Sequence, residues 1–391
     1  MIREYLNKFN KPKEKKSSSF LDLPYLRESE EDKAGADAYF KNIIVHRCVS
    51  LIAISASHVP WVVYKQSNLD KKHPINSLLQ HPNADISGAD FFTEVIANLL
   101  LYGNSYIVTT HSNNNLPSEL HILRPNAVDL VSRKSSIVAY KYRTTEGEKI
   151  YPIDHLSRIS RVLHLKNYHP TNHQLELSSL QAAAASINMH AKIMDWNKAL
   201  LKNAARPSGA LVFQDGNGYL TDEQFQRLQE QFYENFSGSS NSGKPLILEG
   251  GLKWQETNNA ERFEKFIELK DSAARDIAIA FNVPPQLLGI NGDNTYSNMQ
   301  EARLALWEEN IIPLLDKLSD AFSGWFSYWF NEPLRIDFDR DSISALTEKR
   351  EDLWSKISNA DFMTINEKRA FFGLEAIKGG DGLHNQKMGI K

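Results

Sequence analysis

Apolar residues recur with helical spacing in two long segments of the second half of the chain. The first segment runs from residue 261 to 281 with a period near 3.6 residues, and the second runs from Ser297 to Phe330. At 1.5 Å per residue, the second helix would span roughly 50 Å. Pro313 lies inside it, lacks a backbone N–H and crowds the preceding turn, so we predict a kink near residues 309–313.

A polar, glycine-containing stretch separates these two patterns. Pro284 and Pro285 predict the end of the first helix, and Gly289 opens a loop that consists mostly of Gly, Asn and Asp. Ser297 and Gln300 have the spacing of a capping box, in which each side chain bonds a free backbone N–H at a helix start. We therefore expect a polar loop between two rigid helices.

The first 165 residues mix helical and strand patterns. Helices are predicted from residue 42 to about 56 and from Gly88 to Tyr102. Ser87 is a candidate N-cap of the second helix, and Gly103 follows where a left-handed residue would end it. Short apolar or alternating runs predict the strands WVVYK, SYIVTT, LHIL, AVDLV, IVAYKY and RVLHL. This part of the chain is predicted to be α+β.

The middle of the chain is predicted to be mostly helical. An Ala-rich helix over residues 180–203 precedes the strand GALVF, and Thr221 with Gln224 forms a capping-box pattern at the start of another helix. The polar stretch GSSNSGK and a predicted strand, PLILEG, follow. Near the end of the chain, Thr364 and Glu367 repeat the capping-box pattern and predict a further helix.

Composition narrows the class of protein. The chain has 391 residues, 41% apolar and 24% charged, and a formal net charge of −3, which argues against a protein held to nucleic acid mainly by charge. The single cysteine, Cys48, excludes an intrachain disulfide. Apolar stretches such as Val95 to Tyr102 are shorter than the ~20 residues of a membrane span. Residues 1–20 have no apolar core and predict a flexible basic arm, with Lys8, Lys11, Lys13, Lys15 and Lys16.

Two stretches are similar to ligand-binding motifs without meeting their requirements. Residues 238–245, GSSNSGKP, place Pro245 where a phosphate-binding loop needs a hydroxyl, and a helix instead of a strand is predicted before them. Four histidines and one acid are close in sequence: Asp154, His155, His164, His169 and His173. Pro170 disfavours a helix at this place, so ligands are not expected to converge on one helix face. We favour a polar loop and scattered surface histidines.

Catalytic patterns are missing as well. The sequence has no G-x-S-x-G motif, and Cys48 falls on the buried side of its predicted helix. The acids Asp337, Asp339 and Asp341 lack the spacing of an EF-hand and are interpreted as a charged turn after a strand. We predict no catalytic residue, no cofactor and no metal.

Four aromatic residues share one face of the long helix: Phe322, Trp325, Phe326 and Trp329. They could pack in a core. They could also form a subunit interface, because the helix is longer than a small domain can cover. The sequence leaves both interpretations open.

These segments together resemble the portal proteins of tailed bacteriophages, of the Hong Kong 97 type. The resemblance extends over roughly residues 40–381 and includes LLLYGNSYI, LRPNAVDL, VLHLK, RPSGALVF and LTDEQ. Its most specific parts are FNVPPQLLG followed by NTYSNMQEA, within residues 281–302, and the C-terminal FMTINEKRAFFGLEAIKGGD.

The resemblance implies an α+β portal fold with a wing, a helical stem, a small clip, a long kinked helix and a helical crown. Transferred to this chain, it assigns a basic arm to 1–39, the wing to 40–180, stem helices to 181–205 and 256–288, the clip to 206–255, a tunnel loop to 289–297, the kinked helix to 298–331, and the crown and tail to 332–391. It also implies a set of loop residues that face DNA: Asn291, Gly292, Asp293, Asn294, Thr295 and Tyr296.

The resemblance further implies a ring of about twelve subunits at one capsid vertex, through which double-stranded DNA is packaged and ejected without sequence recognition. Its expected partners are the terminase large subunit, the major capsid protein and a head–tail adaptor. Its expected place is the virion, after assembly in the host cytoplasm, with no membrane and no enzymatic activity. The residues agree at one point, because loop 291–296 has no Lys or Arg to grip phosphates.

Two alternatives from other classes remain open at this point. One is a monomeric helical adaptor or scaffold protein that binds one partner through the Phe322–Trp329 face. The other is a nucleotide- or metal-dependent hydrolase that uses GSSNSGK or the histidines.

Overall fold

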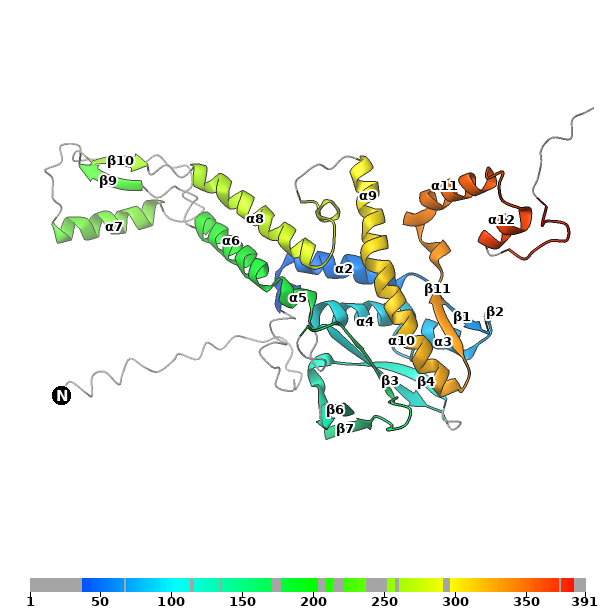
Figure 1. The fold of residues 1–391 in the computed structure, drawn as a ribbon. Coiled ribbons are helices and arrows are strands. Elements are labelled where there is room, and N and C mark those ends of the chain that lie inside the picture. Colours follow the sequence, from blue (N-terminus) through cyan, green and yellow to red (C-terminus); the bar gives the residue numbers. More distant parts are fainter. Residues whose placement is uncertain are drawn as a thin grey trace, which may run out of the picture.

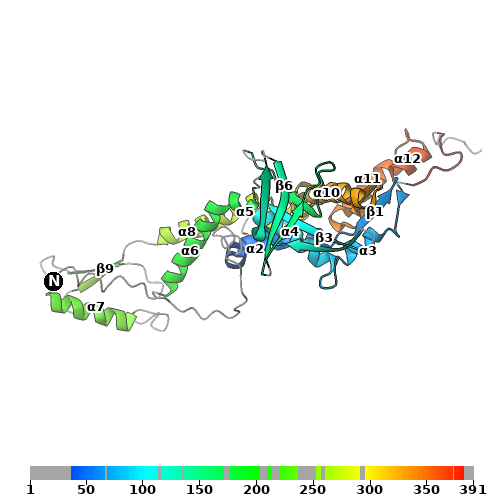
Figure 2. The same cartoon turned by 90° about the horizontal axis from the view of Figure 1, so that it is seen from below.

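The computed structural model describes residues 37–382, except 67, 113–115, 134–135, 146, 171–176, 203–208, 214–220, 237–251, 257–259, 291–295 and 373. A mixed body of helices and strands lies in the middle of the molecule (Figures 1 and 2). A two-helix arm leaves one side and carries a small unit at its end, and two C-terminal helices lie on the other side. The predicted α+β class is confirmed.

The body begins with two long helices and most of the strands. In chain order these elements are α2 (Ile43–Ser57), β1 (Trp61–Lys65), β2 (Asn68–Leu69), α3 (Pro74–Gln80), α4 (Gly88–Tyr102), β3 (Asn104–His111), β4 (Pro117–Leu123), β5 (Val128–Arg133), β6 (Ser136–Thr144), β7 (Gly147–Pro152) and β8 (Val162–Lys166). The six predicted strands of this region are confirmed, and α3, β2 and β7 are additions to the prediction. The caps of α4 are also as predicted, because Ser87 accepts the Asp90 N–H and Gly103 is left-handed, with φ 78°.

The arm and the C-terminal part are mainly helical. The arm contains α5 (Ser179–Ala182), α6 (Ala184–Lys202), β9 (Gly209–Phe213), α7 (Asp222–Phe236), β10 (Leu252–Glu256) and α8 (Ala260–Ala280). The C-terminal part contains α9 (Tyr296–Leu306), a π-helical segment (Trp307–Ile311), α10 (Ile312–Phe330), β11 (Leu334–Phe338), α11 (Thr347–Ser358) and α12 (Ile365–Phe371).

In the arm, α6 and α8 run side by side (Figure 1), and the rings of Trp196 and Phe266 stack between them with centroids 3.8 Å apart. The capping box of α7 is confirmed: Thr221 N–H donates to Gln224 Oε1 at 3.0 Å, and Gln224 N–H donates to Thr221 Oγ1 at 3.3 Å. The helix predicted over 180–203 is broken at Ala183, between α5 and α6. GSSNSGK and PLILEG lie outside the described residues.

The main core joins distant parts of the chain. Trp61 of β1 stacks on Phe92 of α4 with ring centroids 5.0 Å apart, and Phe322 of α10 meets both rings at 6.0 and 5.9 Å. Phe326, one turn further along α10, stacks on Phe322 at 5.8 Å. Helix α10, from the C-terminal part of the chain, is therefore packed against aromatic side chains from the first hundred residues.

The aromatic face of α10 belongs to this core. Phe322 and Phe326 are 0% exposed, Trp325 is 4% exposed, and the Trp325 Nε1–H donates to the Ser160 carbonyl at 2.9 Å. Trp329 is half-buried against the same cluster. Side chains covered by their own chain have no surface left for a neighbour. The predicted subunit interface is therefore wrong for Phe322, Trp325 and Phe326, and core packing accounts for the pattern.

Strand β11 closes the sheet of the N-terminal strands. It pairs antiparallel with β1, with Trp61 opposite Phe338 and Lys65 opposite Leu334, and the strand order is β11-β1-β2. Hydrophobic periodicity gives no information on such a pairing, because the partners are separated by most of the chain. The body is thus built from both ends of the described sequence, and the arm is an insertion within it.

A ladder of serines on α10 covers the other edge of β11. Ser323 Oγ accepts the Ile336 N–H at 2.8 Å and donates to the Ile336 carbonyl at 3.2 Å. Ser327 Oγ accepts the Leu334 N–H at 2.9 Å and donates to the Leu334 carbonyl at 3.1 Å, and Ser319 Oγ also donates to Ile336. A sheet edge normally leaves these backbone groups unpaired. We name Ser319, Ser323 and Ser327 the serine ladder.

A second, smaller core lies between the two other sheets of the body, whose strand orders are β4-β3-β8 and β5-β6-β7. The partly buried His164 ring packs there against Tyr106, with ring centroids 4.3 Å apart, and Tyr140, at 5.6 Å. Burial lowers the pKa of His164 to about 3, so this imidazole is neutral. The interpretation of His164 as a surface histidine is therefore wrong, because its ring packs between two tyrosines.

Candidate functional site at the kink of the long helix

The first component of the site is the end of α8. Asn282 is left-handed, with φ 51°. Its N–H donates to the Ile279 carbonyl, and the Val283 N–H donates to the Ala278 carbonyl, both at 2.9 Å. This pair of bonds is a Schellman motif with Asn282 in the position that glycine usually occupies. The helix therefore ends before Asn282 and not at Pro284 and Pro285, where the sequence predicts its end.

The second component is the interruption of the long helix. The π-helical segment Trp307–Ile311 separates α9 from α10, and the Ile312 N–H bonds the carbonyl five residues back, at Trp307. Pro313 stands in the first turn of α10. The helix axis changes direction between α9 and α10 (Figure 1). The interruption thus lies directly before Pro313 and overlaps the predicted kink at 309–313.

Two asparagine side chains connect these components. Asn282 Nδ2 donates to the Glu309 carbonyl at 3.0 Å. Asn310 Nδ2 donates to the Phe281 carbonyl at 2.9 Å and to the Asn282 carbonyl at 2.8 Å. We name Asn282 and Asn310 the asparagine clasp. Each amide bonds carbonyls on the other element, and so the clasp fixes the end of α8 to the π-helical segment.

The clasp has a simple chemical cause. The last carbonyls of an α-helix have no N–H partner within the helix, and the Phe281 carbonyl at the end of α8 is one of them, with the Asn282 carbonyl directly after it. In an α-helix the Glu309 carbonyl would accept the N–H of residue 313, and proline has none. The clasp was not predicted from the sequence. Two features of the sequence indicate it. Asn282 follows the end of α8, and Asn310 is next to Glu309, whose carbonyl lacks its usual N–H donor because residue 313 is proline.

Most of the predicted DNA-facing loop, namely Asn291, Gly292, Asp293, Asn294 and Thr295, lies outside the described residues. Tyr296 is the first residue of α9. Ser297 therefore lies inside the first turn and not at the predicted N-cap position. On the near side of the loop, Val283 and Ile290 are 3% and 8% exposed, so both side chains are anchored in the body.

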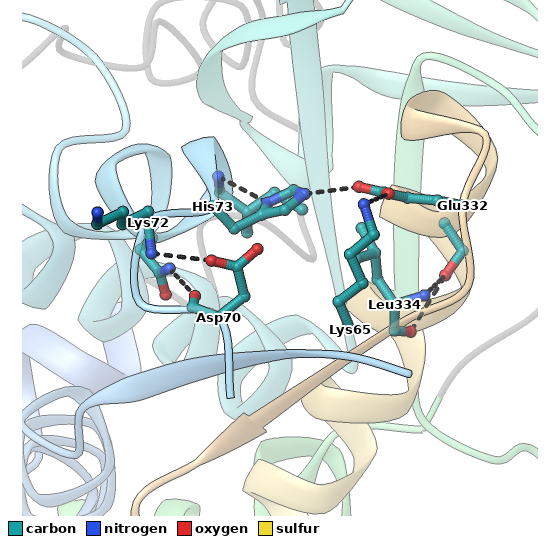
Figure 3. A network of polar contacts seen from close by, with 9 residues as sticks. Lys65, Asp70, Lys72, His73, Glu332 and Leu334 are labelled. Atoms are coloured by element: carbon teal, nitrogen blue, oxygen red, sulfur yellow. Dashed lines mark hydrogen bonds and ion pairs between the residues drawn. The ribbon is translucent and has the colours of Figure 1, made fainter. Parts of the chain in front are cut away.

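The far end of the long helix is fixed by a polar network (Figure 3). The Glu332 carboxylate, just beyond α10, accepts the His73 Nε2–H at 2.9 Å and forms an ion pair with Lys65 of β1. His73 Nδ1 accepts the Ile75 N–H at 3.3 Å as the N-cap of α3, which assigns the ring proton to Nε2. The hydrogen bonds from Lys65 and His73 lower the pKa of Glu332. The network ties α10 to β1 and α3.

The candidate acids have structural partners. Asp339 accepts the Asp341 N–H at 2.9 Å, Asp341 forms an ion pair with Arg350, and Asp337 lies 3.5 Å from Arg335. Across the part of the chain that the structure describes, no three His, Cys, Asp or Glu side chains are grouped as metal ligands would be. The described helices also include none that is long and apolar enough to cross a membrane.

The capping box near the C-terminus is confirmed and has a neighbour. Thr364 Oγ1 accepts the Glu367 N–H at 3.2 Å, and the Glu367 carboxylate accepts the Thr364 N–H at 2.8 Å. Asn366 holds the following loop, because its Oδ1 accepts the Ile377 N–H at 2.8 Å and its N–H donates to the Gly380 carbonyl at 2.9 Å. The segment from Thr364 to Glu367 is thus a helix start combined with a loop anchor.

These observations define a class of protein. It is an elongated α+β protein of several modules, in which one kinked helix crosses the body and is fixed at its middle by the asparagine clasp and at its end by Glu332. A helical arm holds a small terminal unit away from the body.

Comparison with known proteins identifies the family. The phage portal protein family matches residues 44–373. A protein of Rickettsia bellii is 57% identical over 98% of this chain and 100% of its own length. A chain from the neck of a native gene transfer agent particle, computed with C12 symmetry, is 35% identical with a TM-score of 0.69, over 88% of this chain and 92% of that chain. A Hong Kong 97 family portal protein from Corynebacterium diphtheriae, 16% identical, shares the fold with a TM-score of 0.56 over 81% of this chain and 99% of that chain.

The chain belongs to the phage portal protein family. The resemblance found in the sequence is confirmed, as is the predicted function of a portal at a capsid vertex.

Proposed function

We propose that about twelve copies of this chain form a ring-shaped channel at one vertex of a phage-like capsid, through which double-stranded DNA is packaged and ejected. The observation that carries this proposal is the match, over most of both chains, to a neck protein in a particle computed with C12 symmetry. The chain acts as a passive conduit, and a separate packaging motor supplies ATP hydrolysis. The ring resides in the virion after assembly in the host cytoplasm.

The modules of the structure support an assignment to portal regions. The N-terminal part of the body, residues 40–180, is the wing, the α6–α8 pair is the stem, and β9, α7 and most of β10, within 206–255, form the clip. Residues 298–331 are the long kinked helix, and α11 and α12 within 332–391 form the crown. The support is the arrangement in Figure 1, where the clip unit and the crown helices lie on opposite sides of the body.

We assign Asn291 to Tyr296 to a tunnel loop that faces DNA. Its two flanks are rigid, because α8 ends in a Schellman motif and α9 begins at Tyr296. The sequence of the loop has polar groups and one acid but no Lys or Arg. Each phosphate contact made by a cation releases counterions and strengthens binding, which would resist the passage of DNA. A loop without cations touches DNA weakly and without sequence preference.

The partners follow from the position at a vertex. The ring contacts the major capsid protein at its outside, the terminase large subunit during packaging and a head–tail adaptor afterwards. The clip unit, which the arm holds away from the body, is the surface that we assign to the terminase and then to the adaptor.

The experiment that tests the function is the assembly state of the purified chain. Negative-stain images and light scattering are expected to show rings of about twelve subunits, as in the C12 neck of the related particle. A stable monomer at every concentration, with capsid protein present as well as absent, would contradict the portal function and favour the helical adaptor. A purified ring is also expected to show no ATP hydrolysis, and steady turnover would favour the hydrolase.

Alanine substitutions across Asp293 to Tyr296 test the tunnel loop. They are expected to leave ring assembly intact and to reduce the nuclease-protected DNA per particle, because the contacts that retain DNA are lost. The matched control is Thr145→Ala in the exposed turn after β6, away from the loop and from the clip unit, which is expected to leave packaging unchanged. Normal packaging and retention in the loop variants would show that these residues do not act on DNA.

A further inference from the structure

The asparagine clasp joins the end of α8, which precedes the tunnel loop, to the π-helical segment at the C-terminal end of α9, which follows the loop. We propose that Asn282 and Asn310 are positioning residues, which set the separation and relative orientation of α8 and α9 and thereby the place of the tunnel loop in the channel. The inference rests on the proposed function, because that function puts the loop in the channel. The clasp itself consists only of described residues.

Asn282 has two roles, one through its left-handed backbone and one through its side-chain amide. Its backbone is left-handed, which glycine adopts without strain and asparagine tolerates better than most residues. Its side chain also supplies the amide that bonds the Glu309 carbonyl at 3.0 Å. A glycine here would keep the Schellman motif and remove only the amide. Substitution by glycine therefore separates the backbone role from the side-chain role.

Pro313 makes the Glu309 carbonyl available to Asn282. An α-helix would pair this carbonyl with the N–H of residue 313, which proline lacks. The preceding π-helical segment accommodates one more residue in its turn than an α-helix does. The proline, the π-helical segment and Asn282 therefore depend on one another. A change in one alters which backbone groups the others must pair with.

The clasp acts on the loop through α9. This helix, Tyr296–Leu306, runs without a break from the loop to the π-helical segment. If the π-helical segment returned to α-helical geometry, α9 would lose one residue of register and turn by about 100° about its axis. Such a turn moves a Cα atom by roughly 3.5 Å across the helix, given the radius of the α-helix. The clasp opposes this turn by holding Glu309 and Asn310 against the end of α8.

The test measures the distance between α8 and α9 directly. Spin labels are placed at Ser272→Cys on α8 and Ser297→Cys on α9, both exposed positions. Cys48 is fully buried, and burial raises its pKa to about 12, so this thiol is not labelled. Rings contain one labelled subunit among unlabelled ones, and pulsed electron–electron double resonance reports the distance distribution. The unsubstituted clasp is expected to give one narrow peak.

Four substitutions, alone or combined, test the positioning role. Asn282→Gly is expected to add a second distance peak, because the Glu309 carbonyl loses its amide. Pro313→Ala restores an N–H for that carbonyl, so Asn282→Gly added to it is expected to cause no further shift. Asn310→Ala checks the other half of the clasp and is expected to broaden the peak. Asn331→Gly is the control, because Asn331 is also left-handed, with φ 50°, but ends α10 away from the loop.

The outcomes separate this inference from the proposed function. A failure of the unsubstituted chain to form rings or to retain DNA would contradict the portal function. Normal rings in which Asn282→Gly leaves the distance unchanged, or shifts it equally with and without Pro313→Ala, would overturn the positioning role. A second peak in Asn282→Gly together with a loss of retained DNA, absent in Asn331→Gly, supports it. A second peak with unchanged DNA retention would also overturn the role.

Discussion

Replacement of Phe322 by alanine is expected to lower the free energy of unfolding of the body by about 3–5 kcal/mol, as for other large aromatic side chains removed from a core. The side chain is 0% exposed and touches the rings of Trp61, Phe92 and Phe326. These contacts come from β1, α4 and α10, so the cavity would open where three elements meet. Urea unfolding followed by circular dichroism measures the loss.

The control for this substitution lies on the same helix. Tyr328 is 42% exposed, and Tyr328→Ala is expected to cost less than about 1 kcal/mol, as for most surface substitutions. A Phe322→Ala variant that unfolds like the unsubstituted chain but no longer forms rings would contradict the core interpretation. It would return the aromatic face to the subunit-interface hypothesis.

Replacement of all three serines of the serine ladder by alanine is expected to lower the free energy of unfolding by at least about 3 kcal/mol. Four backbone groups, the N–H and C=O of Leu334 and Ile336, would lose their side-chain partners. Each buried group left unsatisfied costs about 1–3 kcal/mol. The higher helix propensity of alanine offsets part of this loss, by less than about 0.7 kcal/mol per residue.

Hydrogen exchange shows whether the loss arises at β11. The amides of Leu334 and Ile336 are expected to exchange faster in the triple variant, because their acceptors are the hydroxyls of Ser327 and Ser323. Ser272→Ala, on the exposed side of α8, is the control and is expected to change stability by no more than about 0.5 kcal/mol. Unchanged exchange at both amides would show that the ladder does not hold the strand.

The sequence predicted what depends on neighbouring residues. Helix caps such as those at Ser87 and Thr364 were found because their hydrogen bonds join groups three residues apart. The site of the helix interruption was found for the same reason, since Pro313 acts on the turn before it. Resemblance to portal proteins supplied the family, which no single periodic pattern could have done.

The features that were missed depend on residues far apart in the chain. The asparagine clasp needs Asn282 and Asn310 to meet across a loop, and asparagine has no distinctive pattern in either helix. The β1–β11 pairing also joins residues that are far apart in the sequence. The aromatic face of α10 was ambiguous because exposure depends on what covers a helix, and Trp61 and Phe92 of the covering elements lie more than two hundred residues away.

The pairing of β11 with β1 also affects when the body can fold during synthesis on the ribosome. A nascent chain that has emerged up to the end of the arm presents α2, β1 and α4 without their C-terminal partner, so Trp61 and Phe92 stay in contact with water. Domains usually fold from the N-terminus as they are synthesised. Here the body can close only when Phe322 and Phe338 have left the exit tunnel. A chain terminated before Phe322 therefore keeps an open core and is not expected to join a ring.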